Sequence, residues 1–371
     1  MKIICSKNSL LKSVSISLKA VPSKTTMPIL ECILIDATTN QIKFTTNDME
    51  LGIETIVDGT IAEKGMVALD AKIFYEIIRR LPDNDVTIKT DDKFAATITC
   101  EKAKFNIPGK SGEDFAYLPL IEREESLTIS QYTLKEMIRQ TIFSIAVNEN
   151  NKLMTGELFE IKDNCLKVVS LDGHRIAIRK MPLKRTYSDR KVVVPGKTLN
   201  EISKILSGEM DDMVSIFFTK NHILFEFDQT MVVSRLIEGE YFRIEQMLSS
   251  DYETKLSINK KEFLDCIDRA TLLVREGDKK PIIIHITDNN MELKIDSAMG
   301  SMNEEIDIEK EGKDILIGFN PKFLIDALKV IDDEIINIYL VNPKAPCFIR
   351  DDEENYTYLI LPVNINQNQA R

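Results

Sequence analysis

The chain has 371 residues, of which 43% are hydrophobic and 29% charged, and its net charge at pH 7 is −11. This length gives room for two or three domains with full-sized cores, and the composition excludes disordered and fibrous proteins. No apolar run approaches the roughly 20 residues of a membrane helix, and the first residues lack the apolar stretch of a signal peptide. We therefore expect a soluble protein of the cytoplasm.

The first third of the chain combines two strand-to-helix units with a pair of strands. Ile3 to Val14 and Val67 to Ile78 each run from an apolar strand through a turn into an amphipathic helix. Between them, Ile33 to Ile35 and Ile42 to Thr46 have the pattern of paired strands. The charged stretch Glu122 to Ser126 then interrupts the pattern and predicts a linker.

The middle third repeats the same order of elements. Leu127 to Ile138 and Val192 to Ser203 are its strand-to-helix units, and Leu158 to Ile161 with Leu166 to Ser170 are its predicted strand pair. A second polar linker follows at Ser249 to Lys255.

The last third contains the order once more. Leu256 to Ile267 and Ile317 to Leu328 are strand-to-helix units, and Ile282 to Ile286 with Met291 to Ile295 are paired strands. Three copies predict an α+β fold of three domains, each with two helices packed on antiparallel strands. We place the domains at residues 1–124, 125–253 and 254–371.

A lysine opens the second helix of each copy, and an acidic residue follows it by four positions. The three pairs, each 125 residues from the next, are Lys72 with Glu76, Lys197 with Glu201, and Lys322 with Asp326. Residues four apart share a helix face, so the spacing predicts ion pairs within the helices.

Two segments have features of enzyme sites. Pro195 to Thr198 resembles the end of a phosphate-binding loop, but Lys191 stands where that loop needs glycine, and the sister copies start helices at the same place. His174 lies two residues after Asp172, a pair that could serve acid–base chemistry, although a turn or binding role fits better. A nucleotide-binding enzyme using Lys197 and His174 remains as an alternative.

Metal and disulfide chemistry is not favoured. The six cysteines stand singly without a CxxC pair, so we expect buried thiols and neither a zinc cluster nor a disulfide framework; they are Cys5, Cys32, Cys100, Cys165, Cys266 and Cys347. The acidic runs Asp211-Asp212 and Asp351 to Glu354 lack calcium-loop spacing, which indicates solvated loops. We expect no metal and no cofactor.

Positive charge concentrates on the six predicted helices. These helices carry a net +8, and the rest of the chain carries −19. Besides the helix-opening lysines, much of this positive charge comes from Lys12, Lys19, Arg79, Arg80, Lys135, Arg139, Lys204, Arg269 and Lys329. Basic helices within an acidic protein indicate that the helices face one partner, although helices are often mildly rich in lysine.

The threefold repeat over nearly the whole chain, LDGHRIAI at 171–178 and YLILPV at 358–363 resemble the bacterial DNA polymerase III beta subunit family, the sliding clamps. The resemblance implies a non-catalytic processivity factor, a head-to-tail homodimer that closes into a ring around duplex DNA. Twelve lining helices at roughly 9 Å spacing would leave an opening about 24 Å across. A scaffold that binds peptides without DNA is a third possibility.

The resemblance implies where DNA and the second subunit lie. The DNA-facing set comprises Lys12, Lys19, Lys24, Arg79, Arg80, Lys135, Arg139, Lys152, Lys197, Lys204, Arg269 and Lys329. Their contacts would be weak and independent of base sequence, because phosphate contacts position a protein without reading bases. Leu272 and Leu273 match the family's subunit interface, with Ile107 opposite, although a pair of leucines on a helix also suits a core.

The resemblance further implies an apolar groove for short linear peptides of the polymerase alpha subunit, the clamp loader, other polymerases and repair proteins. Its residues would be Met154, Leu171, Gly173, His174, Arg175, Ile176, Phe242, Gln246, Met247, Asn320, Phe323, Leu359, Ile360, Leu361, Pro362 and Val363. They could instead be core residues between domains. Phe242 and Gln246 replace the family's usual proline and arginine, and the polar tail 364–371 is hypothesised to be mobile and to contact the groove.

Overall fold

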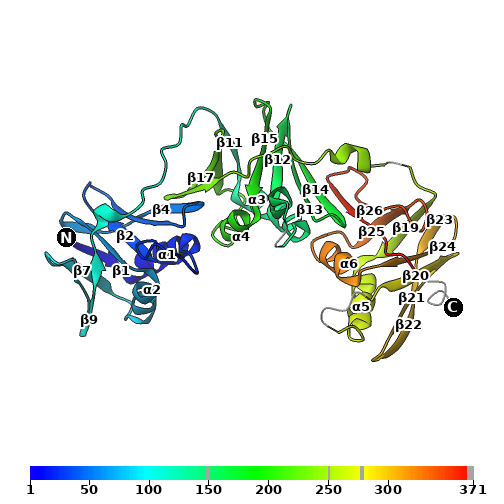
Figure 1. The fold of residues 1–371 in the computed structure, drawn as a ribbon, viewed down its shortest axis with the longest axis horizontal. Helices are drawn as coiled ribbons and strands as arrows, with labels where there is room; N and C mark the ends of the chain where they lie inside the picture. The colour runs from blue at the N-terminus through cyan, green and yellow to red at the C-terminus, as the bar shows by residue number, and fades with distance from the viewer. Residues whose placement is uncertain (148–149, 250, 276–279, 366–371) are drawn as a thin grey trace. The chain divides into compact units, whose positions relative to one another are not determined.

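The structure, a computed structural model, describes residues 1–147, 150–249, 251–275 and 280–365. The chain forms two compact units (Figure 1). Unit 1 contains Met1–Lys135 and Lys197–Leu236, and unit 2 contains Glu136–Gly196 and Ile237–Arg371. Each unit therefore combines one outer repeat of the sequence with part of the middle repeat.

Unit 1 is built on two sheets. The five-stranded sheet has the order β5 (Thr60–Glu63), β1 (Lys2–Ser6), β7 (Asp85–Thr90), β8 (Ala96–Cys100) and β9 (Ala103–Ile107). The nine-stranded sheet has the order β10 (Gly109–Lys110), β6 (Met66–Asp70), β2 (Cys32–Asp36), β3 (Ile42–Asn47), β4 (Leu51–Val57), β18 (Thr230–Arg235), β17 (His222–Phe227), β16 (Met213–Phe218) and β11 (Ser126–Ser130). The antiparallel pair β4–β18 makes one continuous sheet from the first and middle repeats.

Unit 2 repeats this design. Its nine-stranded sheet has the order β15 (Arg190–Pro195), β12 (Gly156–Lys162), β13 (Cys165–Leu171), β14 (Arg175–Pro182), β27 (Tyr356–Ile360), β26 (Cys347–Arg350), β25 (Ile335–Leu340), β19 (Thr254–Asn259) and β23 (Glu309–Gly312). Its four-stranded sheet has the order β22 (Gly300–Asp307), β21 (Asn290–Ser297), β20 (Ile282–Thr287) and β24 (Ile315–Phe319). The pair β14–β27 joins the middle and last repeats.

Within the described ranges, six α-helices begin where the strand-to-helix units predicted them. They are α1 (Lys7–Ser17), α2 (Ala71–Arg80), α3 (Gln131–Arg139), α4 (Gly196–Ser203), α5 (Lys260–Thr271) and α6 (Pro321–Leu328). Short 3-10 helices are η1 (Leu18–Ala20), η2 (Gly112–Asp114), η3 (Ile142–Ser144), η4 (Lys152–Thr155) and η5 (Ile244–Met247). The three predicted strand pairs are confirmed as β2–β3, β12–β13 and β20–β21.

Side-chain caps explain why the second helices start at these residues. Asp70 Oδ1 accepts a hydrogen bond from the Ile73 amide at 2.8 Å, and Asn320 Oδ1 accepts one from the Lys322 amide at 3.0 Å. Such caps satisfy amides that a helix cannot pair internally. The interpretation of these segments as helix starts is confirmed.

The predicted ion pairs within these helices are wrong. Glu76 pairs with Arg79 and Arg80, Glu201 with Lys204, and Asp326 with Arg175; these acidic groups bind other cations than the opening lysines. A lysine that precedes its acid by four residues has the weaker orientation, and a cation in the first turn opposes the helix dipole.

Burial of the cysteines agrees with the sequence for five of six. Cys5, Cys32, Cys100, Cys266 and Cys347 are buried free thiols, whereas Cys165 is half-buried. Burial raises the pKa of the Cys5, Cys266 and Cys347 thiols to about 12. These thiols are therefore protonated and unreactive at neutral pH.

The acidic runs lie in loops. Asp351 to Glu354 form the tip of the β26–β27 hairpin, while Asp212 lies between α4 and β16 and accepts a hydrogen bond from Ser207 Oγ at 2.6 Å. Over the described ranges, no group of three or more His, Cys, Asp or Glu residues is arranged to hold a metal. Among the same residues, no helix has the length and apolarity to cross a membrane.

Candidate peptide groove and basic helices

The two sequence motifs meet at the junction of β14 and β27, which we call the second seam. Arg175 pairs with Ile360 and Ile176 with Leu359 across this antiparallel ladder. Beyond β27, the Leu361 amide donates to the His174 carbonyl at 2.9 Å, and the Val363 amide donates to the Gly318 carbonyl at 2.8 Å. Residues far apart in the chain thus form one surface of unit 2.

A tight turn presents His174 at the end of this seam. Asp172 Oδ1 accepts hydrogen bonds from the amides of His174 (3.0 Å) and Arg175 (3.1 Å). Gly173 has φ +83°, and a Cβ added there would have no heavy atom within 4 Å. The glycine is therefore favoured by the left-handed backbone and not by crowding.

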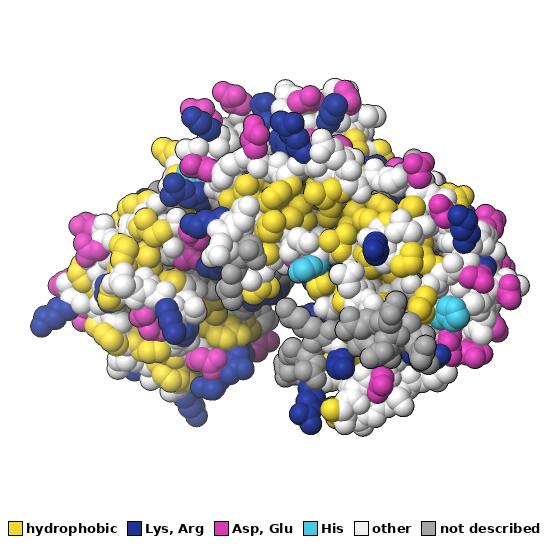
Figure 2. All heavy atoms as spheres, turned by 45° about the vertical axis from the view of Figure 1, so that its right-hand side comes forward, with side chains coloured by type: hydrophobic (Ala, Val, Ile, Leu, Met, Phe, Trp, Pro, Cys, Tyr) yellow, Lys and Arg dark blue, Asp and Glu magenta, His cyan; other side chains and the backbone are white. Residues whose placement is uncertain are grey.

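An apolar floor lies beside the turn. Leu171, Ile176 and Leu359 are buried in one cluster with Tyr241 and Ile244. Around this floor, Met154 and Phe242 are half-buried, while Gln246, Met247, Leu361 and Val363 are exposed and Pro362 is half-buried. Figure 2 shows hydrophobic side chains gathered on the face of unit 2 turned to the viewer.

One predicted groove residue lies elsewhere. Ile360 belongs to the large core cluster of unit 2 that also contains Phe263 of α5 and Leu324 of α6. Because successive strand residues face opposite sides of a sheet, Ile360 is directed away from the surface that Leu359 lines. It supports the sheet from behind, and a sequence run of apolar residues does not distinguish the two sides.

The start of α6 forms one lip of the surface. The half-buried Phe323 ring stacks on the exposed His174 ring with centroids 5.9 Å apart. Asn320 caps the helix and is half-buried. Of the tail, Asn364 and Ile365 are described, and Ile365 packs on Gly318; the expectation for 366–371 lies outside the described residues.

Seven of the twelve predicted DNA-facing cations already have a partner. Arg79 and Arg80 share Glu76, Lys204 binds Glu201, and Arg269 binds Glu304. Of the others, Lys197 pairs with Asp48, Lys135 donates a hydrogen bond to the Leu206 carbonyl, and Arg139 pairs with Glu136 and Asp332. Much of the positive charge on these helices is therefore neutralised locally.

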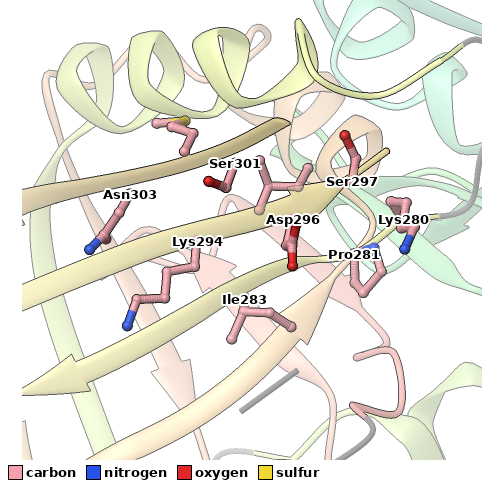
Figure 3. Close-up of a pocket in the computed structure, with 10 residues that line it drawn as sticks. Lys280, Pro281, Ile283, Lys294, Asp296, Ser297, Ser301 and Asn303 are labelled. Carbon is pink, nitrogen blue, oxygen red and sulfur yellow. The ribbon is translucent and has the colours of Figure 1, made fainter. Parts of the chain in front are cut away.

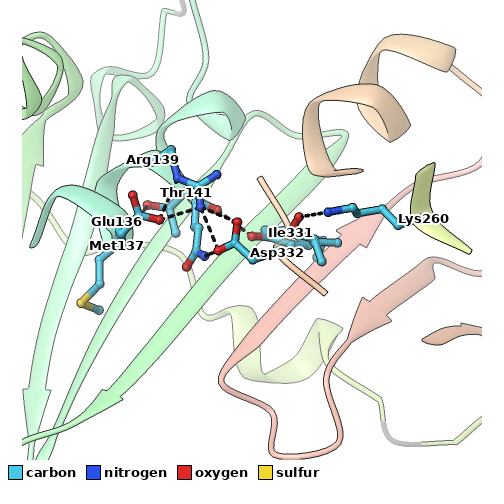
Figure 4. A network of polar contacts seen from close by, with 9 residues as sticks. Glu136, Met137, Arg139, Thr141, Lys260, Ile331 and Asp332 are labelled. Atoms are coloured by element: carbon cyan, nitrogen blue, oxygen red, sulfur yellow. Dashed lines mark hydrogen bonds and ion pairs between the residues drawn. The ribbon is translucent and has the colours of Figure 1, made fainter. Parts of the chain in front are cut away.

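Arg139 lies in a polar network of unit 2 (Figure 4). Its Nη2 atom donates to Glu136 Oε2 at 2.6 Å and to Asp332 Oδ2 at 3.0 Å. Nearby, Lys260 Nζ donates to the Ile331 carbonyl at 2.6 Å. These bonds connect α3 and α5 to the loop that follows α6.

The other five predicted cations have no partner in the described part of the chain. Lys12, Lys19, Lys24, Lys152 and Lys329 have no ion pair or side-chain hydrogen bond there, and all except the half-buried Lys19 are exposed. A free ammonium group can approach a phosphate without first breaking an internal bond.

Comparison with known proteins agrees with this architecture. Models of the DNA polymerase III beta subunit match its N-terminal domain at residues 1–119, its central domain at 128–242 and its C-terminal domain at 245–364. The chain belongs to the DNA polymerase III beta subunit family. The three-domain clamp fold expected from the sequence is thereby confirmed.

Individual relatives are sliding clamps. A beta sliding clamp of Staphylococcus aureus is 35% identical over 94% of this chain and 95% of its own length. A crystal structure assigned as a DNA polymerase III beta subunit from Eubacterium rectale is 71% identical, with TM-score 0.96 over 98% of this chain and all of that one. The Bacillus subtilis sliding clamp structure has 34% identity and TM-score 0.95, covering 99% of this chain and 100% of its own.

The sliding-clamp family supports the leading expectation and gives no support to a nucleotide-binding enzyme. Lys197, one half of that alternative, is held by Asp48 in unit 1. His174, the other half, stacks on a ring in unit 2. Neither residue has an arrangement typical of catalysis.

Two apolar edges contain the residues that the resemblance implied for a subunit contact. At the end of α5, Leu272 is 74% exposed, while Leu273 packs against the unit 2 core. Ile107 on β9 packs against the unit 1 core. Its neighbour Phe105 is exposed and, with Ile73 and Ile77 of α2, lines an apolar hollow of about 350 Å³.

Neither Ile73 nor Phe105, which line this hollow, was predicted from the sequence. The sequence did contain one indication of an exposed apolar side chain, since Phe105 is a large apolar residue between Lys104 and Asn106 in a short strand. It also missed a cavity of about 410 Å³ on the β20–β22 sheet, where Lys280, Lys294, Asp296 and Ser301 are among the lining residues (Figure 3). Its charged lining residues are Lys280, Lys294 and Asp296, and Lys294 is already paired with Glu292.

Proposed function

We propose that this protein is a DNA sliding clamp and processivity factor of the cytoplasmic replication machinery, without catalytic activity of its own. Two copies would join head to tail, and the six resulting domains, with boundaries near 124 and 253, would enclose duplex DNA. The succession of three clamp domains along the chain carries this proposal. In such a ring, closure retains the DNA, so strong adhesion is unnecessary.

The contact with DNA would depend on the unpaired lysines. Lys12, Lys19, Lys24, Lys152 and Lys329 are the first candidates, because their ammonium groups have no partner among the described residues. The paired cations, such as Arg79 and Arg139, would contribute less. Few weak contacts suit a protein that must move along its template.

The subunit contact would join two unlike edges. β9 is the edge strand of the five-stranded sheet, and β22 is the edge strand of the four-stranded sheet. Lys104 on β9 and Glu305 on β22 have opposite charges, and exposed Leu272 would meet the hollow beside Phe105 in the second copy. A heterologous contact of this kind closes into a ring when its rotation permits.

The surface at the second seam would bind short peptides of the replicative polymerase, the clamp loader and repair proteins. Its exposed Met247, Leu361 and Val363 border a buried apolar floor, as expected of a peptide groove. A Pseudomonas aeruginosa sliding clamp, 22% identical, has been crystallised with griselimycin. We infer that this ligand would bind in the groove of the present chain.

Topology provides the decisive test. Clamp protein loaded on nicked circular DNA by a clamp loader should remain bound in gel filtration, and linearising the DNA should release it within minutes. Equal release from circles and lines would overturn the ring. As a companion measurement, sedimentation at micromolar protein should give about twice 42.3 kDa, and Leu272→Asp should shift the mass toward that of one chain.

A further inference from the structure

Arg175, one of the residues that the resemblance implied for the groove, is enclosed within unit 2. Its side chain is only 8% exposed. Nε donates to Asp172 Oδ2 at 2.9 Å, Nη1 donates to Asp326 Oδ2 at 2.7 Å, and Nη2 donates to the Phe143 carbonyl at 2.6 Å. These acceptors belong to the seam turn, to α6 and to η3, so one guanidinium connects three segments.

Aromatic rings complete the enclosure. The Arg175 guanidinium carbon lies 4.6 Å from the Phe323 ring centroid and 5.4 Å from that of Phe143. Phe323 in turn stacks on His174. The position of the groove lip thus depends on a cation beneath it.

We propose that Arg175 is a positioning residue for the groove and does not itself contact a bound peptide. It holds α6 and the Asp172–His174 turn together, so that Phe323 and His174 form the lip before any partner arrives. This inference rests on the proposed function of the groove. A preformed lip lowers the ordering cost of binding.

Energetics favour this role over direct contact. A peptide that drew Arg175 outward would leave the Asp172 and Asp326 carboxylates without their cation, and both are largely buried. Leaving a buried charge unpaired is costly, and lysine cannot replace the planar fork that reaches three acceptors.

The two roles predict opposite results for Asp326→Asn. If Arg175 contacts the ligand, removing a competing carboxylate frees the guanidinium, and binding stays equal or becomes tighter. If Arg175 positions the lip, Asp326→Asn weakens binding much as Arg175→Lys does. Because both changes break one coupled unit, the double variant should bind the ligand as tightly as the single variant of lower affinity.

Calorimetric titration of griselimycin into the full chain tests this difference. We expect about a tenfold loss of affinity for Arg175→Lys and for Asp326→Asn, and no further loss in the double variant. Arg179→Lys, four residues along the same strand, is the matched control and should bind within twofold of the natural chain. Unchanged or tighter binding by Asp326→Asn, or losses that multiply to about a hundredfold, would overturn the proposal.

A second readout needs no ligand. The chain contains no tryptophan, so Phe323→Trp introduces a single fluorescent reporter on the lip. In this background Arg175→Lys and Asp326→Asn should shift the emission to longer wavelength and increase acrylamide quenching, whereas Arg179→Lys should not. An unmoved reporter refutes positioning. If the reporter responds to these two changes but the natural chain does not bind griselimycin, the result supports positioning and counts against the proposed function of the groove.

Discussion

Two seams of the molecule use the same backbone for different purposes. The first seam, β4–β18 in unit 1, begins with Asp48 and Met49; the second, β14–β27 in unit 2, begins with Asp172 and Gly173. In both, the first Asp Oδ1 accepts two turn amides, and the following residue has φ near +80°, 76° for Met49 and 83° for Gly173.

The difference between the seams is the origin of the cation that binds the Asp. At the first seam Asp48 Oδ2 binds Lys197 from α4. At the second seam, Arg175 forms ion pairs with both Asp172 and Asp326. Lys322, the counterpart of Lys197, has no ion pair within the described ranges. Leu51 occupies the position of Arg175, so one residue of the turn determines which element supplies the charge.

The outer surfaces of the seams differ as well. At the first seam, a Cβ on Gly52 would lie 2.1 Å from Leu118 Cδ2, so the segment between η2 and β11 packs directly on the sheet. At the second, Ile176 occupies the corresponding position, and the nearby Leu361 and Val363 remain exposed. Repetition supplies a stable frame, and side-chain choice at a few positions makes only one seam suited to a partner.

The largest expected effect comes from making the second seam resemble the first. Arg175→Leu leaves two largely buried carboxylates unpaired and should destabilise the local structure by about 3 kcal/mol. Hydrogen exchange of the β27 amides would report this loss. Arg179→Leu is the control, and adding Asp326→Leu should recover part of the loss. A change below about 0.5 kcal/mol for Arg175→Leu would contradict the positioning role of Arg175.

The second effect concerns the core beneath the seams. Glu157 in β12 lies opposite Val194, as Ile33 in β2 lies opposite Leu69, yet Glu157 is 0% exposed and its carboxyl oxygens have no hydrogen-bond partner among the described residues. Burial raises the pKa of this carboxyl well above its usual range, and the nearby Thr141 hydroxyl donates to the Met137 carbonyl instead. Glu157→Ile should therefore stabilise the protein by about 2 kcal/mol at pH 7.

The pH dependence gives this prediction its sign. Above about pH 4.5 the unfolded state releases the Glu157 proton while the folded state retains it, so stability falls as pH rises toward the folded pKa. Urea unfolding at pH 6 and pH 8 should show the gain of Glu157→Ile growing with pH. A gain that is constant, or that shrinks at pH 8, would show that the carboxyl is ionised. Glu160→Gln, on the same strand beside Lys167, is the control.

The turn residues provide a smaller, reciprocal test. Met49 has a left-handed φ that glycine adopts without strain, so Met49→Gly should stabilise the first seam by about 1 kcal/mol. Gly173→Met should destabilise the second by a similar amount. Thermal unfolding of the two variants would measure both changes, and equal signs would show that turn strain is not the common factor.

The smallest effect is expected for the ion pair at the first seam, whose lysine is exposed while the buried Asp48 carboxylate keeps its two turn amides. Lys197 is 58% exposed, so its bond to Asp48 is screened by solvent and worth at most about 0.5 kcal/mol. Lys197→Met should lower the melting temperature by no more than a degree or two at low salt and by nothing measurable in 0.5 M NaCl. A loss as large as that of Arg175→Leu would remove the distinction between the seams.

Local sequence patterns predicted the repeats because they depend on neighbouring residues. Strand alternation, helix phase and caps such as Asp70 and Asn320 are determined within a few positions. The predicted pairing of Lys72 with Glu76 failed because the competing Arg79 and Arg80 lie on the same helix with better orientation. The residues proposed for the groove came from motifs, but Ile360 could not be assigned to a face without its strand partners.

The sequence by itself determined three copies of a strand-and-helix module, the positions of their helices and the two motifs that identify the family. Only the tertiary structure decided that Arg175 reaches Asp326, that Lys197 reaches Asp48, and that Leu272 is exposed while Leu273 is covered. Periodicity reports the side of an element on which a residue lies. It carries no information about which distant charge or ring will face that side, because such contacts depend on how whole sheets join.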